Sequence, residues 1–233
     1  MINFHPDQQM LLLHAEGKLP LSLSIAVSAH LEYCGKCQQE LTSAQAKATN
    51  TFLSDDSLAV ESQHGNEQSD AAQTNADLDS MLDAMMSGLD DLKIDDIPSV
   101  EEPLTVEVKG EQYSLPRVFK NQLLSEWQGI GKVTRSRLDT GEGKARASLL
   151  HIDANGEIPQ HTHKGTEITL LLAGEFSDEY NQYKPGDLMV MTPDHKHSPK
   201  TMEGCLCYTV VDAPLYFTKG ISKLLNPIGE LIY

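Results

Sequence analysis

Apolar residues recur at helical spacing through the first part of the chain, in stretches separated by Pro and Gly. We predict helices over residues 6–16, 20–33 and 37–53, with Pro6 in the first turn of the first helix and Gly35 bending the chain before the third. These helices form an all-α unit of about 50 residues. A unit of that size rarely has a secure core of its own, so a metal or a partner would stabilise it.

From residue 103 the apolar period changes to two. We predict short β-strands in six segments bounded by Gly, Pro and Asp: residues 105–115, 131–139, 145–153, 167–179, 187–193 and 205–212. Many short strands at regular spacing are typical of a sandwich or a barrel. The end of the chain, residues 216–233, is ambiguous and fits a short helix followed by a tail.

Residues 55–102 separate these regions and are strongly acidic, with fourteen Asp and Glu residues against one Lys. Because like charges repel one another, we interpret this segment as an extended linker. One apolar stripe at helical spacing interrupts it: Leu78, Leu82, Met85, Leu89 and Leu92. This predicted helix either folds back onto a domain or docks into a groove of a partner protein, to which Met side chains adapt well.

The overall charge narrows the range of partners. A formal net charge of −16 argues against direct binding to DNA or RNA, because phosphate contacts need Lys and Arg, and it suits a basic protein partner instead. No apolar run predicts a membrane span, and the first residues lack the features of a secretory signal. We therefore expect a cytoplasmic protein whose four cysteines do not form structural disulfides.

Three potential metal ligands lie close together near the start of the chain. His30 precedes Cys34 by four residues, so the two share a helix face, and Cys37 follows at the start of the third predicted helix. Structural zinc needs four ligands, and the fourth would come from His5, ahead of the first helix, or from the competing His14. Two cysteines at this spacing also occur in redox dithiols, but those follow a strand in a βαβ unit, whereas helices flank this pair.

The pattern His-x3-Cys-x2-Cys with an upstream His resembles the zinc-binding anti-sigma domain. His30, Cys34 and Cys37 match the motif directly, and His5 matches the upstream ligand by position. The resemblance implies a helical unit that holds zinc and occludes a sigma factor of the extracytoplasmic-function class.

A second group of ligand types lies in the β region. In a strand His161 and His163 point the same way, and Glu167 follows after a short turn. About thirty residues later come His195 and His197; we prefer His197, because His195 would point to the opposite face of an extended segment. Imidazole and carboxylate ligands suit zinc, iron, manganese and nickel alike.

These residues resemble the two cupin motifs, the first as Gly-x4-His-x-His-x3-Glu-x6-Gly and the second as Pro-Gly-Asp, then Pro, then His. The first motif departs by one residue in its opening spacer, and His195 replaces the usual Gly of the second. The resemblance implies a small β-barrel that holds a divalent metal through His161, His163, Glu167 and His197. Cys205 and Cys207 either face opposite sides of the barrel wall or pack within it, with a thiol sensor near the metal as the alternative.

A zinc-binding anti-sigma unit joined to a cupin is similar to the ChrR family of anti-sigma factors. The expected fold class is α+β multidomain, with an all-α zinc-binding domain (1–52), an acidic linker with one amphipathic helix (53–102), an all-β cupin barrel (103–220) and a tail (221–233). The expected partner-binding residues are Leu78, Leu82, Met85 and Leu89.

The resemblance implies a non-enzymatic transcription regulator that sequesters an extracytoplasmic-function sigma factor, with 1:1 stoichiometry, and releases it under singlet-oxygen or related oxidative stress through its cupin. Zinc is expected in the helical domain, and zinc or another divalent transition metal in the cupin. Two alternatives remain from the residues alone. One is a metal-dependent cupin enzyme, dioxygenase-like, with a helical appendage; the other is a metal-storage or scaffold protein.

Overall fold

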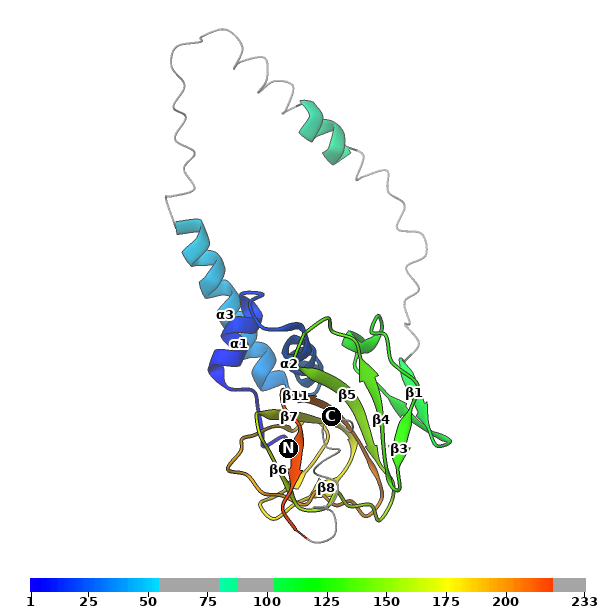
Figure 1. Ribbon diagram of the computed structural model, residues 1–233. Coiled ribbons are helices and arrows are strands. Elements are labelled where there is room, and N and C mark those ends of the chain that lie inside the picture. Colours follow the sequence, from blue (N-terminus) through cyan, green and yellow to red (C-terminus); the bar gives the residue numbers. More distant parts are fainter. Residues whose placement is uncertain (55–79, 88–102, 220–233) are drawn as a thin grey trace. The chain divides into compact units, whose positions relative to one another are not determined.

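The structure, a computed structural model, describes residues 1–54, 80–87 and 103–219 (Figure 1). Its first helices are α1 (Gln8–Ala15), α2 (Leu21–Tyr33) and α3 (Gly35–Ser54). Among the described residues no helix is long and apolar enough to cross a membrane.

Two predicted helix boundaries were wrong. Helix α1 begins at Gln8 rather than at Pro6, because the Asp7 carboxylate caps it by accepting a 2.7 Å hydrogen bond from the Met10 amide. Gly35 does not break the chain but is the first residue of α3. The break is at Cys34, whose backbone is extended, with φ −119° and ψ 95°. This single extended residue separates α2 from α3.

The β region is larger than the six predicted segments. Its elements are β1 (Thr105–Val108), β2 (Glu111–Ser114), η2 (Arg117–Phe119), β3 (Gln128–Ile130), β4 (Val133–Leu138), β5 (Arg146–Ile152), β6 (His161–His163), β7 (Glu167–Gly174), β8 (Phe176–Ser177), β9 (Gln182–Tyr183), β10 (Leu188–Met191), β11 (Cys205–Val211) and β12 (Leu215–Phe217). Strands β3, β9 and β12 are short and were not predicted. Strand β12 includes the start of the ambiguous end segment, of which residues 220–233 lie outside the described part of the chain.

One antiparallel sheet organises this half, with the strand order β10-β7-β11-β5-β4-β3. Strand β12 pairs with β6, and β8 pairs with β9. Single bridges join His161 to His197 and Ser177 to Lys200. These pairings bring β6 and the His197 segment together, so they juxtapose three of the histidines predicted to be metal ligands.

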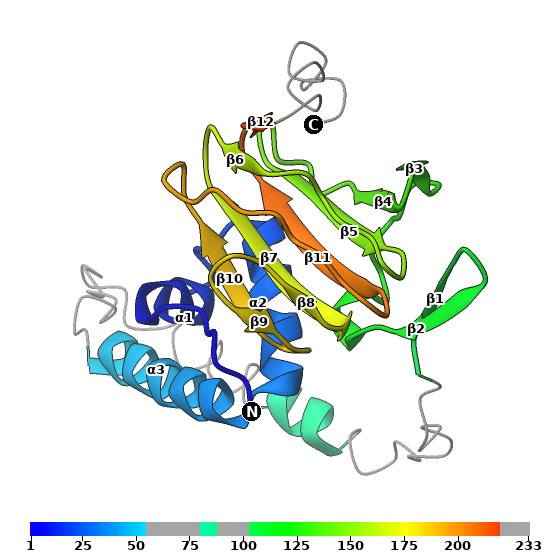
Figure 2. The ribbon, with the colours of Figure 1, turned by 90° about the horizontal axis from the view of Figure 1, so that it is seen from below.

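Helix α2 packs on one face of this sheet, along β7 and β11 (Figure 2). Ile25, Ala26 and Ala29 of the helix share an apolar cluster with sheet residues such as Leu149 and Tyr208. The opposite side of α2 packs on α1 and α3. The apolar cluster at this contact includes Leu11, Val27, Leu31, Cys34 and Cys37. Being buried on two sides explains why α2 is apolar around most of its circumference.

Polar contacts fix this packing at both ends of α2. The buried Tyr208 hydroxyl donates a 2.9 Å hydrogen bond to the Ser22 carbonyl, and the Tyr33 hydroxyl donates one of 3.1 Å to the Leu172 carbonyl. The helical and β regions therefore share one apolar core and a set of hydrogen bonds.

Residues 80–87 form a short helix in a separate unit of the chain. Its apolar side chains are exposed: Met81, Leu82, Met85 and Met86. Leu78, Leu89 and Leu92 of the predicted stripe lie outside the described residues.

Candidate metal centres

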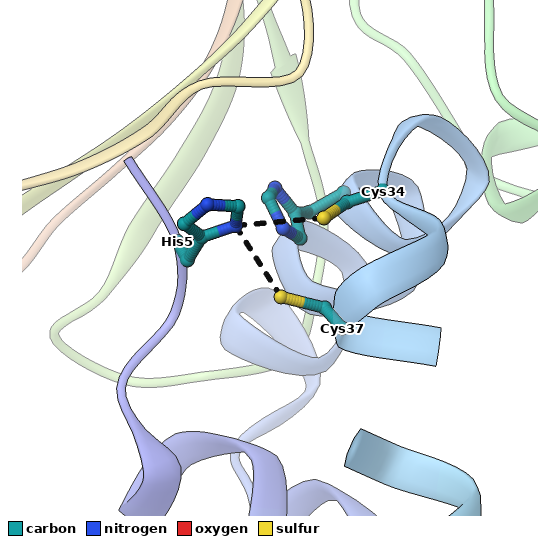
Figure 3. A group of neighbouring side chains, drawn as sticks. His5, Cys34 and Cys37 are labelled. Carbon is teal, nitrogen blue, oxygen red and sulfur yellow. Dashed lines mark hydrogen bonds between the residues drawn. The ribbon is translucent and has the colours of Figure 1, made fainter. Parts of the chain in front are cut away.

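Three segments of the helical region bring His5, His30, Cys34 and Cys37 together, with one ligand atom of each within 4.8 Å of every other. His5 lies in the extended segment before α1, Cys34 separates α2 from α3, and Cys37 lies in the first turn of α3. Figure 3 shows the His5 ring pointing at both sulfur atoms. Its Nδ1 atom is 3.5 Å from Cys34 Sγ and 3.4 Å from Cys37 Sγ.

These separations match a tetrahedral zinc site. With Zn–S near 2.3 Å and Zn–N near 2.0 Å, a tetrahedral angle separates sulfur from nitrogen by about 3.5 Å. His30 is fully buried, and its Nδ1–H donates a 2.6 Å hydrogen bond to the Gly186 carbonyl. This bond leaves the lone pair on Nε2, which has no hydrogen-bond partner in the described part of the chain. An unpartnered buried nitrogen beside two thiols fits a metal ligand.

The two cysteines are buried and unlinked. Burial, with the neighbouring Cys34, raises the pKa of the Cys37 thiol to about 12. A thiol of that pKa does not ionise on its own near neutral pH, so a cation at the cluster would be what deprotonates it. This thiol is therefore unsuited to act as a free redox nucleophile.

His14, the competitor of His5, is not part of this cluster. Its Nε2 atom is 3.4 Å from the Ser28 hydroxyl, on the contact between α1 and α2. The position of His5 ahead of α1 explains the difference, because an extended segment can reach the α2–α3 corner, whereas a ring within α1 cannot leave its helix face.

The second cluster consists of His161, His163, Glu167 and His197, again with one ligand atom of each within 4.8 Å of every other. His161 and His163 lie on β6, Glu167 is the first residue of β7, and His197 is held opposite His161 by two 3.1 Å backbone hydrogen bonds. All four are buried. Strand pairing therefore positions every member of the cluster.

The ring nitrogens of this cluster face one another. His197 Nε2 is 3.1 Å from His161 Nε2 and 3.3 Å from His163 Nε2, and His163 Nε2 is 2.6 Å from Glu167 Oε2. Three Nε2 atoms converge here, and a neutral imidazole whose N–H is on Nδ1, as in His161, presents only a lone pair at Nε2, which needs a hydrogen or a cation to face. A cation at the centre would satisfy them.

Electrostatics support the same conclusion. Burial, with His197 nearby, lowers the pKa of His161 to about 4 and keeps its ring neutral. Burial also opposes ionisation of Glu167, but His163 outweighs it and lowers the pKa of that carboxyl to about 2. The pKa of His163 is raised, because Glu167 more than offsets burial. His161 as a neutral imidazole and Glu167 as a carboxylate are therefore in the ligand forms that divalent transition metals need, whereas Glu167 favours a proton on His163 that a bound metal would displace.

Neighbouring groups orient these ligands, and no sequence pattern pointed to most of them. His161 Nδ1–H donates a 2.9 Å hydrogen bond to the Pro159 carbonyl, and the Thr169 hydroxyl donates one of 2.9 Å to Glu167 Oε1. Asp178 Oδ2 lies 3.5 Å from His197 Nδ1. Such partners fix which ring nitrogen faces the metal.

His195 lies away from this cluster. Its Nδ1 atom accepts a 3.1 Å hydrogen bond from the Thr192 amide, in a local turn, and its ring packs against Tyr180. The structure thus places His197, and not His195, beside His161, His163 and Glu167.

A small apolar pocket adjoins the second cluster. Besides His161, Glu167 and His197, its lining is mostly apolar: Leu150, Ile152, Ile158, Phe176, Met189, Met191, Pro199 and Cys207, with Thr169. Cys205 and Cys207 do not face opposite sides of the wall, because residues two apart on a strand point the same way; both are buried in one apolar cluster. Hydrogen bonding with Cys205 and burial raise the pKa of the Cys207 thiol far above its usual range.

Comparisons with known proteins agree with this architecture. Residues 123–214 match the family model described as a ChrR cupin-like domain. The anti-sigma-E factor ChrR of Cereibacter sphaeroides is 27% identical over 232 residues, which is 99% of both chains.

A solved structure shares the fold. The crystal structure of Rhodobacter sphaeroides SigE in complex with the anti-sigma factor ChrR matches with a TM-score of 0.59 and 23% identity, covering 91% of this chain and 100% of that one. The expected α+β fold, with N-terminal helices followed by a cupin-like region, is confirmed. The chain is thus similar from end to end to an anti-sigma factor of the ChrR type, its residues 123–214 match the ChrR cupin-like domain, and it shares the fold of ChrR in the solved complex.

Proposed function

We propose that this protein is an anti-sigma factor that binds a sigma factor of the extracytoplasmic-function class with 1:1 stoichiometry. The observation that carries the proposal is its similarity to an anti-sigma-E factor over 99% of both chains, with the His5, His30, Cys34 and Cys37 cluster in its helical region. One solved structure that shares the fold is a complex of the anti-sigma factor ChrR with the sigma factor SigE. The net charge of −16 suits a partner whose nucleic-acid-binding surface is basic.

We assign zinc to the helical cluster. Two thiols and two imidazoles are a usual ligand set for structural zinc, and four protein ligands complete its tetrahedron. The metal would stabilise the joint between α2, α3 and the segment before α1, because it ties all three together. The second cluster would hold zinc or another divalent transition metal, since three imidazoles and a carboxylate also suit iron, manganese and nickel.

We further assign the roles of the chain's regions. Residues 1–52 would be the anti-sigma unit, 53–102 an acidic linker with one docking helix, 103–220 the cupin and 221–233 a tail. The docking surface would be Leu78, Leu82, Met85 and Leu89; of these, Leu82 and Met85 are described and are 59% and 64% exposed. Slower amide exchange across residues 78–92 in the complex than in the free protein would support docking, and equal exchange would contradict it.

The cupin would receive the signal that releases the sigma factor. Its metal cluster adjoins an apolar pocket, so a small oxidised molecule could reach a metal there, which fits release under singlet-oxygen or related oxidative stress. The relation to an anti-sigma factor supports a regulatory role for the cupin rather than an enzymatic one.

The decisive experiment replaces ligands of the helical cluster in the full-length protein. Cys34→Ser, Cys37→Ser and His5→Gln should each lower zinc content by about one equivalent per chain, by loss of a ligand, and weaken binding to the cognate sigma factor. His14→Gln is the matched control, because His14 is the neighbouring histidine that does not reach the cluster. Full zinc content and undiminished sigma binding in all three ligand variants would refute the proposal.

A further inference from the structure

The turn Pro185–Gly186–Asp187, between β9 and β10, belongs to the cupin-like region but contacts the helical metal cluster. The sequence marks it as the Pro-Gly-Asp of the second cupin motif. In the structure it lies against the segment before α1 and the end of α2, the elements that carry His5 and His30. None of its residues is a candidate ligand.

The turn orients His30 through a backbone carbonyl. Gly186 O accepts the 2.6 Å hydrogen bond from His30 Nδ1, which leaves Nε2 as the ring nitrogen available to the cluster. Gly186 itself is held to the sheet, since its amide donates a 2.8 Å hydrogen bond to the Leu171 carbonyl of β7. The orientation of His30 is therefore set by the sheet and not by the helical region alone.

The same turn holds the backbone next to His5. The fully buried Asp187 accepts hydrogen bonds at Oδ1 from the amides of Asn3, at 2.7 Å, and Phe4, at 3.0 Å. The Leu188 amide donates a 3.0 Å hydrogen bond to the Phe4 carbonyl. Both backbone polar groups of Phe4, the residue before His5, are thus bonded to the cupin-like region.

Side chains reinforce these backbone contacts. The Phe4 ring lies 5.1 Å from that of Tyr183, which lies 4.8 Å from Phe176 of the apolar pocket. Gly186 has φ +93°, and a Cβ there would lie 2.6 Å from Ile2 Cδ1 and 2.7 Å from Tyr33 Cβ. The glycine therefore permits both the turn conformation and the close approach of the helical region.

We propose that Pro185–Gly186–Asp187 forms the outer shell of the helical metal site, with Asp187 a positioning residue for His5 and the Gly186 carbonyl the positioning group for His30. This inference rests on the proposed zinc site of the helical cluster. It adds that the helical region depends on the cupin-like region to retain its metal. Outer-shell partners of metal ligands commonly change metal affinity by about 10- to 100-fold when they are removed.

The test measures metal affinity in the full-length protein with Co²⁺ as the probe. Sulfur-to-Co²⁺ charge-transfer absorption requires a thiolate ligand, so it reports the cluster with Cys34 and Cys37 and not the cluster of three histidines and Glu167. Asp187→Ala should weaken Co²⁺ binding at the thiolate site by at least about tenfold. Asp187→Asn keeps one carbonyl oxygen and should show a smaller loss. Asp194→Asn, the same change at an exposed aspartate of the same half, should bind as the wild type does.

Phe4→Ala provides a second test that leaves the turn itself unaltered. It removes the ring that packs against Tyr183 and should weaken the thiolate site, whereas Leu12→Ala, at a 44% exposed position of α1, should not. If Asp187→Ala does not fold, Phe4→Ala and Asp187→Asn decide the matter. Wild-type affinity in the variants that fold would overturn the role of the turn. A wild-type protein with no thiolate absorption would instead overturn the metal site on which that role rests.

Discussion

Ile25→Ala should destabilise the helical and β regions together. Ile25 is 1% exposed and belongs to the apolar cluster that α2 shares with the sheet. Deleting three carbons from a buried Ile lowers the free energy of unfolding by about 2–5 kcal/mol. Ala has a higher helix propensity than Ile, which offsets less than about 1 kcal/mol of this loss. We expect a loss of about 3 kcal/mol in the free energy of unfolding.

Urea titration of the zinc-saturated protein measures this loss with two probes. Trp127 is the single tryptophan and packs beside the same cluster from the β region, so its fluorescence follows that region. Circular dichroism at the helix band follows α1, α2 and α3. With a urea slope of about 2 kcal/mol per M, a loss of about 3 kcal/mol moves the midpoint by about 1.5 M.

Both midpoints should move together, because the cluster that loses the side chain is common to both regions. Leu123→Ala is the control, since Leu123 is 79% exposed and its removal should change the free energy of unfolding by less than about 0.5 kcal/mol. A helix transition that moves while the Trp127 transition stays fixed would refute the shared core and show two regions that unfold independently.

Two further predictions concern the β region. His163→Ala should lower bound metal by one equivalent per chain and leave the thiolate absorption with Co²⁺ intact; loss of both signals would show that the sites are not separate. Burial lowers the pKa of His151, more than Asp153 and Glu111 raise it, so the unfolded chain binds that proton more tightly. The contribution of His151 to the free energy of unfolding is therefore fully present above about pH 6.5, and it is lost as the pH falls through the folded-state pKa. His151→Gln should flatten this part of the pH dependence in urea titrations, and an unchanged slope would contradict the assignment.

The sequence predicted most of what is local in this structure. His30 and Cys34 are one helical turn apart, and Cys37 follows directly after the break between α2 and α3. In β6, His161 and His163 point the same way because side chains alternate along a strand. Each such group spans few residues, so no knowledge of the tertiary fold was needed. The choice of His197 over His195 rested on the same alternation.

Long-range contacts were beyond the reach of the same reasoning. Asp187 lies more than 180 positions from Asn3 and Phe4, and no periodicity links them. The apolar residues of α2 indicated burial but not the surface that buries them, so its packing on β7 and β11 was not foreseen. The contact between Asp178 and His197 was missed for a similar reason, because nothing in the local sequence around one acidic residue indicates which distant histidine it will approach.

The two metal clusters differ in what they leave accessible. A zinc ion held by the four residues of the helical cluster would have a complete tetrahedron and no position for another molecule. A five- or six-coordinate metal held by His161, His163, Glu167 and His197 keeps open positions beside the apolar pocket. A chemical signal would therefore enter at the cupin, and the Pro185–Gly186–Asp187 turn connects strand β10 of that pocket to His5 and His30. Since coupling between two binding sites is reciprocal, a molecule that weakens the helical metal site through this turn must itself bind more tightly, by the same factor, once that site has lost its metal.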